Sequence, residues 1–157
     1  MKRIKALIVM MLVAILSAVV VDPIPAQAGA TWQTYTVNKD WSCSAAVTVM
    51  SNVYQKSCIV ANAYGDALAV VAVSNYRGVS VRVHGGPTLY VSGADGFWDV
   101  VNIHTCLDAN ILPGTTRACL GPTTHLPGKA IYSLGEVQYN GDTTWKWTSS
   151  PIGYVYP

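Results

Sequence analysis

Hydrophobic and polar residues alternate along much of this chain, which is the pattern of strands that bury one face. In Val79–His84 three valines alternate with Ser80, Arg82 and His84. Ala67–Ser74 is instead apolar at nearly every position, as expected for a central strand that is buried on both faces. After the first thirty residues, no stretch of about 12 residues has the 3.6-residue period of a helix.

Turn-forming residues separate about eight short segments of this kind, at intervals of roughly 8–12 residues. Glycines and a proline in Gly85–Gly96 predict a loop between two of them. This spacing predicts an all-β fold, a single antiparallel β-sandwich. The other expected strands are Ala45–Met50, Val53–Asn62, Phe97–Leu107, a short strand that ends at Leu120, Ala130–Tyr139 and Thr143–Thr148.

The last two strands form the clearest hairpin, because Asn140-Gly141 suits a two-residue type I′ turn. That turn would place Trp145 opposite Glu136 and Trp147 opposite Leu134. One face of the hairpin would then carry aromatic, apolar and polar side chains together: Tyr132, Leu134, Glu136, Gln138, Trp145 and Trp147.

The first 28 residues have the order of a secretory signal peptide. Three basic residues within the first five positions precede Ala6–Val21, an uncharged run of 16 residues, and the small triplet Ala26-Gln27-Ala28 follows. The run is shorter than the roughly 18–20 residues that cross a bilayer, so a membrane anchor is the weaker alternative. We expect a signal peptide helix over residues 1–28, cleavage after Ala28, no stable membrane insertion afterwards, and a single secreted, extracellular domain over residues 29–157.

Removal of residues 1–28 also removes the net positive charge. Lys2, Arg3 and Lys5 are three of the ten basic residues and Asp22 is one of the eight acidic residues, which leaves seven of each. Nucleic-acid binding needs a clustered basic surface. We therefore expect no nucleic-acid partner.

Four cysteines remain in the exported part, and an even number in an exported chain indicates disulfides. Spacing favours local pairs, Cys43 with Cys58 and Cys106 with Cys119, each directly opposite in a hairpin. The alternative is a metal site, but the chain has no C-x-x-C spacing, and we expect no metal and no cofactor.

Several of these segments resemble the immunoglobulin-like sandwich modules of bacterial exported proteins. The resemblance lies in Val70–Ser74, Val79–Val83, the Leu112-Pro113-Gly114-Thr115-Thr116 turn and the Trp145-Lys146-Trp147 strand, and it spans about residues 50–150. It implies a fold class and no particular ligand or activity.

No catalytic motif is present, so we expect a non-enzymatic module with an unidentified extracellular ligand, either a polysaccharide or a protein. Aromatic residues near hydrogen-bonding side chains suit a sugar, which makes Tyr132, Glu136, Trp145 and Trp147 the candidate ligand face. Packing in the core or at the edge of a sheet is the alternative role for these rings. A secreted hydrolase of extracellular polymer is the second hypothesis, and a protease inhibitor that presents Arg117 in a disulfide-closed loop is the third.

Overall fold

The computed structural model describes residues 30–37 and 41–157, where the chain forms strands and no helix. None of the described residues belongs to a helix that could span a bilayer. The expected signal peptide lies outside the described residues. The strands are β1 (Trp41–Cys43), β2 (Val47–Met50), β3 (Val53–Ala61), β4 (Asp66–Asn75), β5 (Val81–Ser92), β6 (Trp98–Ile103), β7 (Cys106–Ile111), β8 (Thr115–Leu120), β9 (Thr124–His125), β10 (Ala130–Tyr139), β11 (Lys146–Ser149) and β12 (Gly153–Tyr154).

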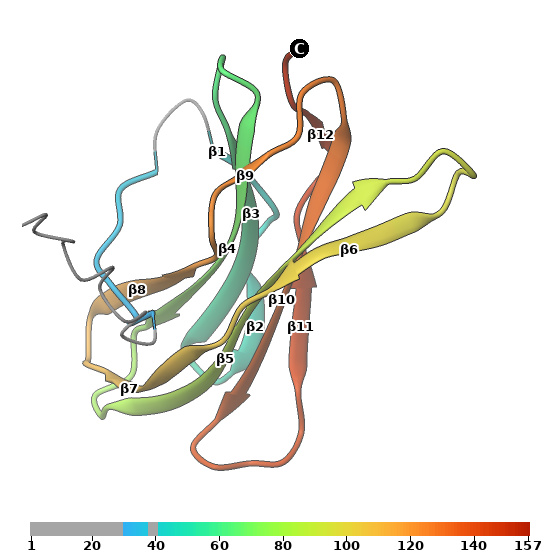
Figure 1. Ribbon diagram of the computed structural model, residues 1–157. Coiled ribbons are helices and arrows are strands. Elements are labelled where there is room, and N and C mark those ends of the chain that lie inside the picture. Colours follow the sequence, from blue (N-terminus) through green and yellow to red (C-terminus); the bar gives the residue numbers. More distant parts are fainter. Residues whose placement is uncertain (1–29, 38–40) are drawn as a thin grey trace, which may run out of the picture.

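These strands form two antiparallel sheets, so the expected all-β sandwich is confirmed (Figure 1). Sheet A has the order β1-β3-β4-β8, with β2 on β3 and β9 on β4; sheet B has the order β11-β10-β5-β6, with β12 on β10 and β7 on β5. The described residues hold twelve strands rather than about eight. Three of the additional strands, β1, β9 and β12, have only two or three residues each, too few for a visible alternation.

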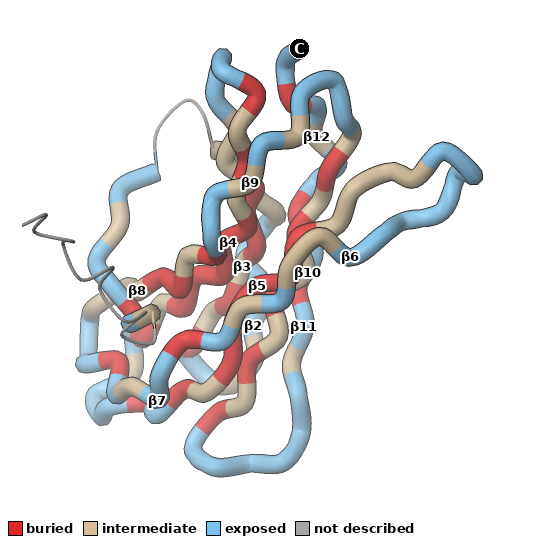
Figure 2. Tube along the Cα trace, in the orientation of Figure 1, coloured by how far each residue is buried: buried red, intermediate tan, exposed pale blue. Residues whose placement is uncertain are grey.

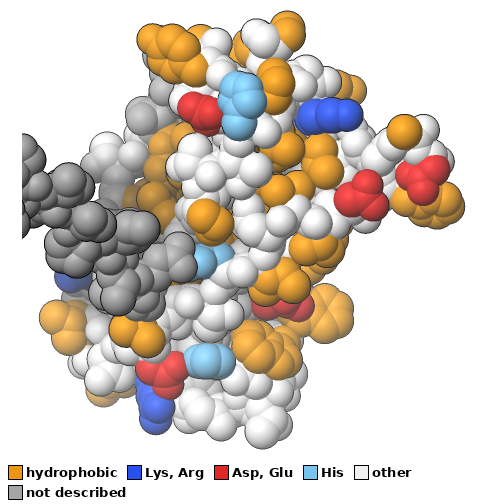
Figure 3. Space-filling model, in the orientation of Figure 1, with side chains coloured by type: hydrophobic (Ala, Val, Ile, Leu, Met, Phe, Trp, Pro, Cys, Tyr) orange, Lys and Arg blue, Asp and Glu red, His pale blue; other side chains and the backbone are white. Residues whose placement is uncertain are grey.

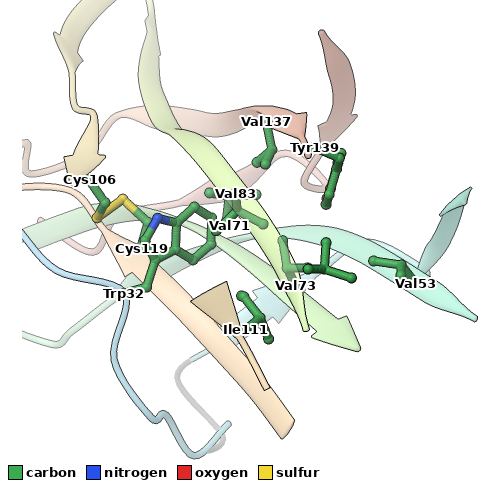
Figure 4. Packing of buried hydrophobic residues seen from close by; sticks show 11 residues of the cluster. Trp32, Val53, Val71, Val73, Val83, Cys106, Ile111, Cys119, Val137 and Tyr139 are labelled. Atoms are coloured by element: carbon green, nitrogen blue, oxygen red, sulfur yellow. A yellow bond between two sulfur atoms is a disulfide. The ribbon is translucent and has the colours of Figure 1, made fainter. Parts of the chain in front are cut away.

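The core lies between the sheets, where the buried segments of β3, β4, β5 and β10 face one another (Figure 2). Val71 and Val73 of β4 pack with Val83 of β5 and Val137 of β10 in the main cluster (Figure 4). A second cluster around Leu89 and Ile131 continues the core at the other end. Outward-facing residues of β4 are buried too, with Val70 and Ala72 in a third cluster, which confirms β4 as a strand covered on both faces.

The predicted loop over Gly85–Gly96 is wrong for its first part, because β5 continues through Gly85-Gly86-Pro87 to Ser92, and the chain turns only at the end of that range, where the Gly93 amide donates to the Phe97 carbonyl. At this point one edge of β5 changes partner, from β7 to β6. A Cβ on Gly85 would lie 2.1 Å from the Glu136 carbonyl oxygen, and one on Gly86 would lie 2.0 Å from that of His104. The glycines therefore allow two neighbouring backbones to approach β5, and the missing N–H of Pro87 falls where the ladder changes partner.

Both predicted cysteine pairs are disulfides. Cys43 lies directly opposite Cys58 in the β1–β3 register, as expected. Cys106 and Cys119 are not opposite each other in a hairpin, which corrects the prediction: β7 belongs to sheet B and β8 to sheet A. This second disulfide therefore joins the two sheets.

The segment before β1 also joins the two sheets. Ala30 accepts a hydrogen bond from Leu107 of β7, and Gln33 forms an antiparallel bridge with Ala118 of β8. Between these contacts Trp32 enters the core and is only 7% exposed. Its indole ring lies beside the inter-sheet disulfide (Figure 4).

Candidate functional site

The outer face of sheet B, which points away from sheet A, carries the residues expected to form a ligand face. Along β10 the buried residues alternate with half-buried Tyr132, Leu134, Glu136 and Gln138. Trp147 of β11 lies on the same face. The strand alternation therefore delivers the predicted side chains of β10 and Trp147 to one surface, whereas Trp145 precedes β11 and is placed by its ring contact with His84.

The predicted register of the hairpin is wrong by two residues: Trp147, rather than Trp145, lies opposite Glu136. The type I′ turn itself is present, since both Asn140 and Gly141 have positive φ and the Asp142 amide donates to the Tyr139 carbonyl. Beyond the turn, the Asp142 carboxylate accepts a hydrogen bond from the Thr144 amide, and the chain leaves the ladder until Lys146. Because the shift is even, the tryptophan stays on the predicted face.

Aromatic rings extend this face toward the hairpin of β5 and β6, which projects from the sandwich (Figure 1). Tyr90 of β5 lies opposite Tyr132 of β10, and their rings stack at 4.6 Å between centroids. Trp98 of β6 packs edge-on against Tyr132 at 4.8 Å. We call the five rings on this face the aromatic strip: Trp145, Trp147, Tyr132, Tyr90 and Trp98.

The three tryptophan rings of the strip are open to solvent, so they are not packed in the core, and Trp147 lies on β11, an edge strand of sheet B. The exposed fractions are 67% for Trp147, 40% for Trp145 and 36% for Trp98. Glu136 lies between Trp147 on β11 and Gly86 on β5, so a carboxylate stands in the middle of the strip. Burial and the neighbouring Tyr90 raise the pKa of the Tyr132 hydroxyl, which therefore remains an uncharged donor.

At the Trp145 end, a cluster of charged residues borders a pocket of about 140 Å³. The Asp108 carboxylate accepts hydrogen bonds from Arg82 Nη2 and from His84 Nδ1, each at 2.6 Å. The His84 ring lies 5.8 Å from that of Trp145. In the space-filling view, an acidic, a basic and a histidine side chain lie together near the bottom of the molecule, with hydrophobic side chains beside them (Figure 3).

The hydrogen bonds from Arg82 and then His84 hold the pKa of Asp108 below its usual range. Asp108 is therefore a carboxylate at neutral pH. Gln138 and Gly141 also line the pocket, and the described lining includes no serine, threonine or cysteine that could act as a nucleophile.

The alternation of β5 already placed Arg82 and His84 on one face, but sequence reasoning did not connect Asp108 with them. That residue comes from β7, more than twenty positions away, and no local pattern joins the two strands. Arg117, the residue expected to contact a protease, lies within β8 opposite Val73, inside the segment that the Cys106–Cys119 disulfide closes.

Comparisons with known proteins give only remote similarity. No protein-family model matches the chain, and no curated protein matches it. A Northeast Structural Genomics Consortium target superposes with a TM-score of 0.38 at 10% identity, over 77% of this chain and 89% of the other. A Bordetella pertussis protein crystallised under the name ApaA superposes with a TM-score of 0.38 at 9% identity, over 82% of this chain and 96% of the other. A calcium-binding mutant of Bacteroides uniformis beta-glucuronidase 2 superposes with a TM-score of 0.37 at 12% identity, over 73% of this chain and 13% of that enzyme.

Proposed function

We propose that this protein is an exported, non-catalytic module that binds neutral polysaccharide on the outer face of sheet B. The observation that carries the proposal is the aromatic strip, in which tryptophan rings remain exposed on a regular sheet beside hydrogen-bonding groups. The C–H faces of sugar rings pack on such rings, while sugar hydroxyls need polar partners at their edges. Contiguous exposed apolar surface rimmed by polar residues commonly marks a binding site.

The polar groups on this face lie where a sugar chain along the strip would meet them. Gln138 lies opposite His84, Glu136 opposite Gly86, and Tyr132 opposite Tyr90, so the polar groups follow the same two strands as the rings. From Gln138 to Tyr132 the strand advances about 20 Å at roughly 3.3 Å per residue. This length accommodates several sugar units in a row, and we infer an extended chain rather than a single sugar.

Charge favours a neutral ligand over an acidic one. The carboxylates of Glu136 and Asp108 lie on this face, and the guanidinium of Arg82 is already paired with Asp108. An acidic polymer would bring its own carboxylates toward Glu136. None of the ion pairs among the described residues includes Glu136, so no basic side chain offsets its negative charge. The Glu136 carboxylate would repel the carboxylates of such a polymer.

The same proposal includes export through the signal peptide and an immunoglobulin-like class of sandwich. Two disulfides support an oxidising compartment. Two antiparallel sheets around one core support the fold class.

The experiment incubates the protein from Gly29 onward with insoluble polysaccharides and measures how much of it leaves solution. Cellulose and chitin are the neutral polymers and calcium pectate is the acidic one. The proposal predicts retention on at least one neutral polymer and weak retention on pectate. Trp147→Ala should abolish retention, and Tyr64→Ala should not, because Tyr64 is 82% exposed in the turn between β3 and β4, outside the strip. Equal retention of both variants would end the proposal.

The Asp108–His84 pair favours a second candidate, hydrolysis of the bound polymer. A histidine that donates Nδ1–H to a carboxylate keeps its other nitrogen available as a base. With no hydroxyl or thiol in the described lining, the attacking group would be water or a carboxylate. Release of new reducing ends from a retained polymer, lost in Asp108→Asn, would establish this activity.

A further inference from the structure

A histidine lies beside the inter-sheet disulfide. His104 follows β6, and its backbone N–H donates to the Pro87 carbonyl at 3.0 Å, which fixes it against β5 two residues before Cys106. A ring nitrogen of His104 and the two sulfur atoms of Cys106 and Cys119 all lie within 4.8 Å of one another. Cysteine sulfur and histidine nitrogen are the ligands that zinc prefers in proteins.

Two buried nitrogens near this disulfide lack hydrogen-bond partners. They are Nε2 of His104 and Nε1 of Trp32. The indole of Trp32 packs in the same cluster as both cysteines, and its nitrogen points toward the sulfur pair (Figure 4). Buried polar atoms without partners are rare in folded proteins, and each calls for an explanation such as a bound water, an ion or a redox role. A disulfide offers them only weakly accepting sulfur, whereas thiolates and a bound ion offer strong partners.

We propose that His104, Cys106 and Cys119 form a Zn²⁺ site when the disulfide between the two cysteines is reduced. Where the disulfide has already formed, the reduction takes place in the unfolded chain: the S–S bond accepts two electrons and two protons from a dithiol, which becomes a disulfide in turn, and gives two thiols. Zn²⁺ then displaces two protons to bind both thiolates, and His104 binds through a neutral ring nitrogen. Three protein ligands leave a fourth position open for water or another ligand.

The disulfide and the zinc site use the same sulfur atoms, so each excludes the other. Cys106 and Cys119 are 1% and 0% exposed, which keeps a dithiol from reaching the folded oxidised protein. The zinc form is therefore reached by folding from the reduced chain, before oxidation. In either form Cys106 and Cys119 link sheet B to sheet A.

The other disulfide, Cys43–Cys58, gives a matched control. Cys43–Cys58 lies on the outer side of sheet A, and no histidine or acidic residue joins it in a three-ligand group within the described ranges. The variants are Cys43→Ser/Cys58→Ser, which keeps the proposed site, and Cys106→Ser/Cys119→Ser, which removes it. A third variant, His104→Gln, keeps the thiols and removes the nitrogen ligand.

The chain from Gly29 onward is reduced in denaturant, refolded without oxygen, and titrated with Co²⁺ and then Zn²⁺ against a chromophoric chelator. The wild type and Cys43→Ser/Cys58→Ser should each bind one equivalent of metal ion, and the Co²⁺ form should show thiolate–cobalt absorption. Cys106→Ser/Cys119→Ser and the oxidised protein should bind no metal ion. His104→Gln should weaken binding at least tenfold. Equal affinity in the two double variants, or no bound equivalent in any of them, would overturn the proposal. The result is independent of polysaccharide binding.

Discussion

The Tyr139 hydroxyl donates a 2.8 Å hydrogen bond to Gln55 Oε1 between the two sheets. The Gln55 amide in turn donates to the Gly135 carbonyl at 3.0 Å and to Thr148 Oγ1 at 3.1 Å. Both residues are buried, so this network holds β3 to β10 and β11 with its polar groups paired. Tyr139→Phe leaves Gln55 Oε1 without this donor and should lower the free energy of unfolding by about 1–3 kcal/mol in urea titrations.

Alkaline pH provides a second readout of the same contact. Burial raises the pKa of Tyr139 far above its ordinary value, so the folded protein keeps the hydroxyl neutral while the unfolded chain ionises it above about pH 10. Its contribution to stability is complete below that pH and falls above it by about 1.4 kcal/mol per pH unit. Tyr139→Phe should therefore show a shallower loss of stability between pH 10 and 11. An identical slope in both proteins would contradict this account.

The two disulfides should differ in what their removal costs. Their sequence separations of 15 and 13 residues predict about 3 kcal/mol each from chain entropy alone. Cys106, Cys119 and Cys58 are buried and only Cys43 is half-buried, so the Cys106–Cys119 pair has one more buried position than the Cys43–Cys58 pair. Replacement of Cys106 and Cys119 by serine thus buries two hydroxyls, at about 1–3 kcal/mol each if unpaired. In urea titrations of the air-oxidised proteins, Cys43→Ser/Cys58→Ser should be the more stable double variant; the reverse order would be the contradicting result.

Trp32 should be important for stability despite its place before the first strand. Trp32→Ala removes a buried side chain from the main core and should cost about 3–5 kcal/mol. The indole N–H has no partner, so Trp32→Phe should cost clearly less than Trp32→Ala. Thermal unfolding of the two variants checks this order, and equal losses would show that the ring contributes little packing.

Glu136 should control discrimination between neutral and acidic polymers. Glu136→Gln keeps the shape and hydrogen-bonding capacity of the side chain but removes its charge from the middle of the strip. Retention on pectate should rise several-fold, most clearly at low ionic strength, and retention on a neutral polymer should change little. Unchanged retention on pectate would show that charge at this position does not select the ligand.

The sequence predicted features that depend on nearby residues. Alternation identified the faces of β10, and the apolar run identified β4 as a strand covered on both sides. Asn140-Gly141 identified the turn, since both positions need positive φ. The register failed because the Asp142 side chain bonds the Thr144 amide and draws two residues out of the ladder. The alternation of apolar and polar residues does not predict a side-chain hydrogen bond that replaces part of the ladder.

Features that depend on the arrangement of the sheets could not be predicted. A spacing of 13 residues suits both a hairpin and a crossing between sheets, so it could not show that Cys106–Cys119 joins them. Asp108 reaches His84 because β7 pairs with the first half of β5. The aromatic face was predicted from strand alternation, whereas the charged pocket at its end required the sheet topology.

Affinity electrophoresis in gels that contain hydroxyethyl cellulose, a soluble neutral polysaccharide, tests polysaccharide binding most directly. Relative mobility is measured for the wild type, Trp147→Ala and Tyr64→Ala, which remove rings of 67% and 82% exposure. The account predicts retardation of the wild type and of Tyr64→Ala, with affinity at least tenfold lower for Trp147→Ala, a loss of about 1.4 kcal/mol. If Trp147→Ala is retarded as strongly as Tyr64→Ala, the outer face of sheet B does not bind the polymer.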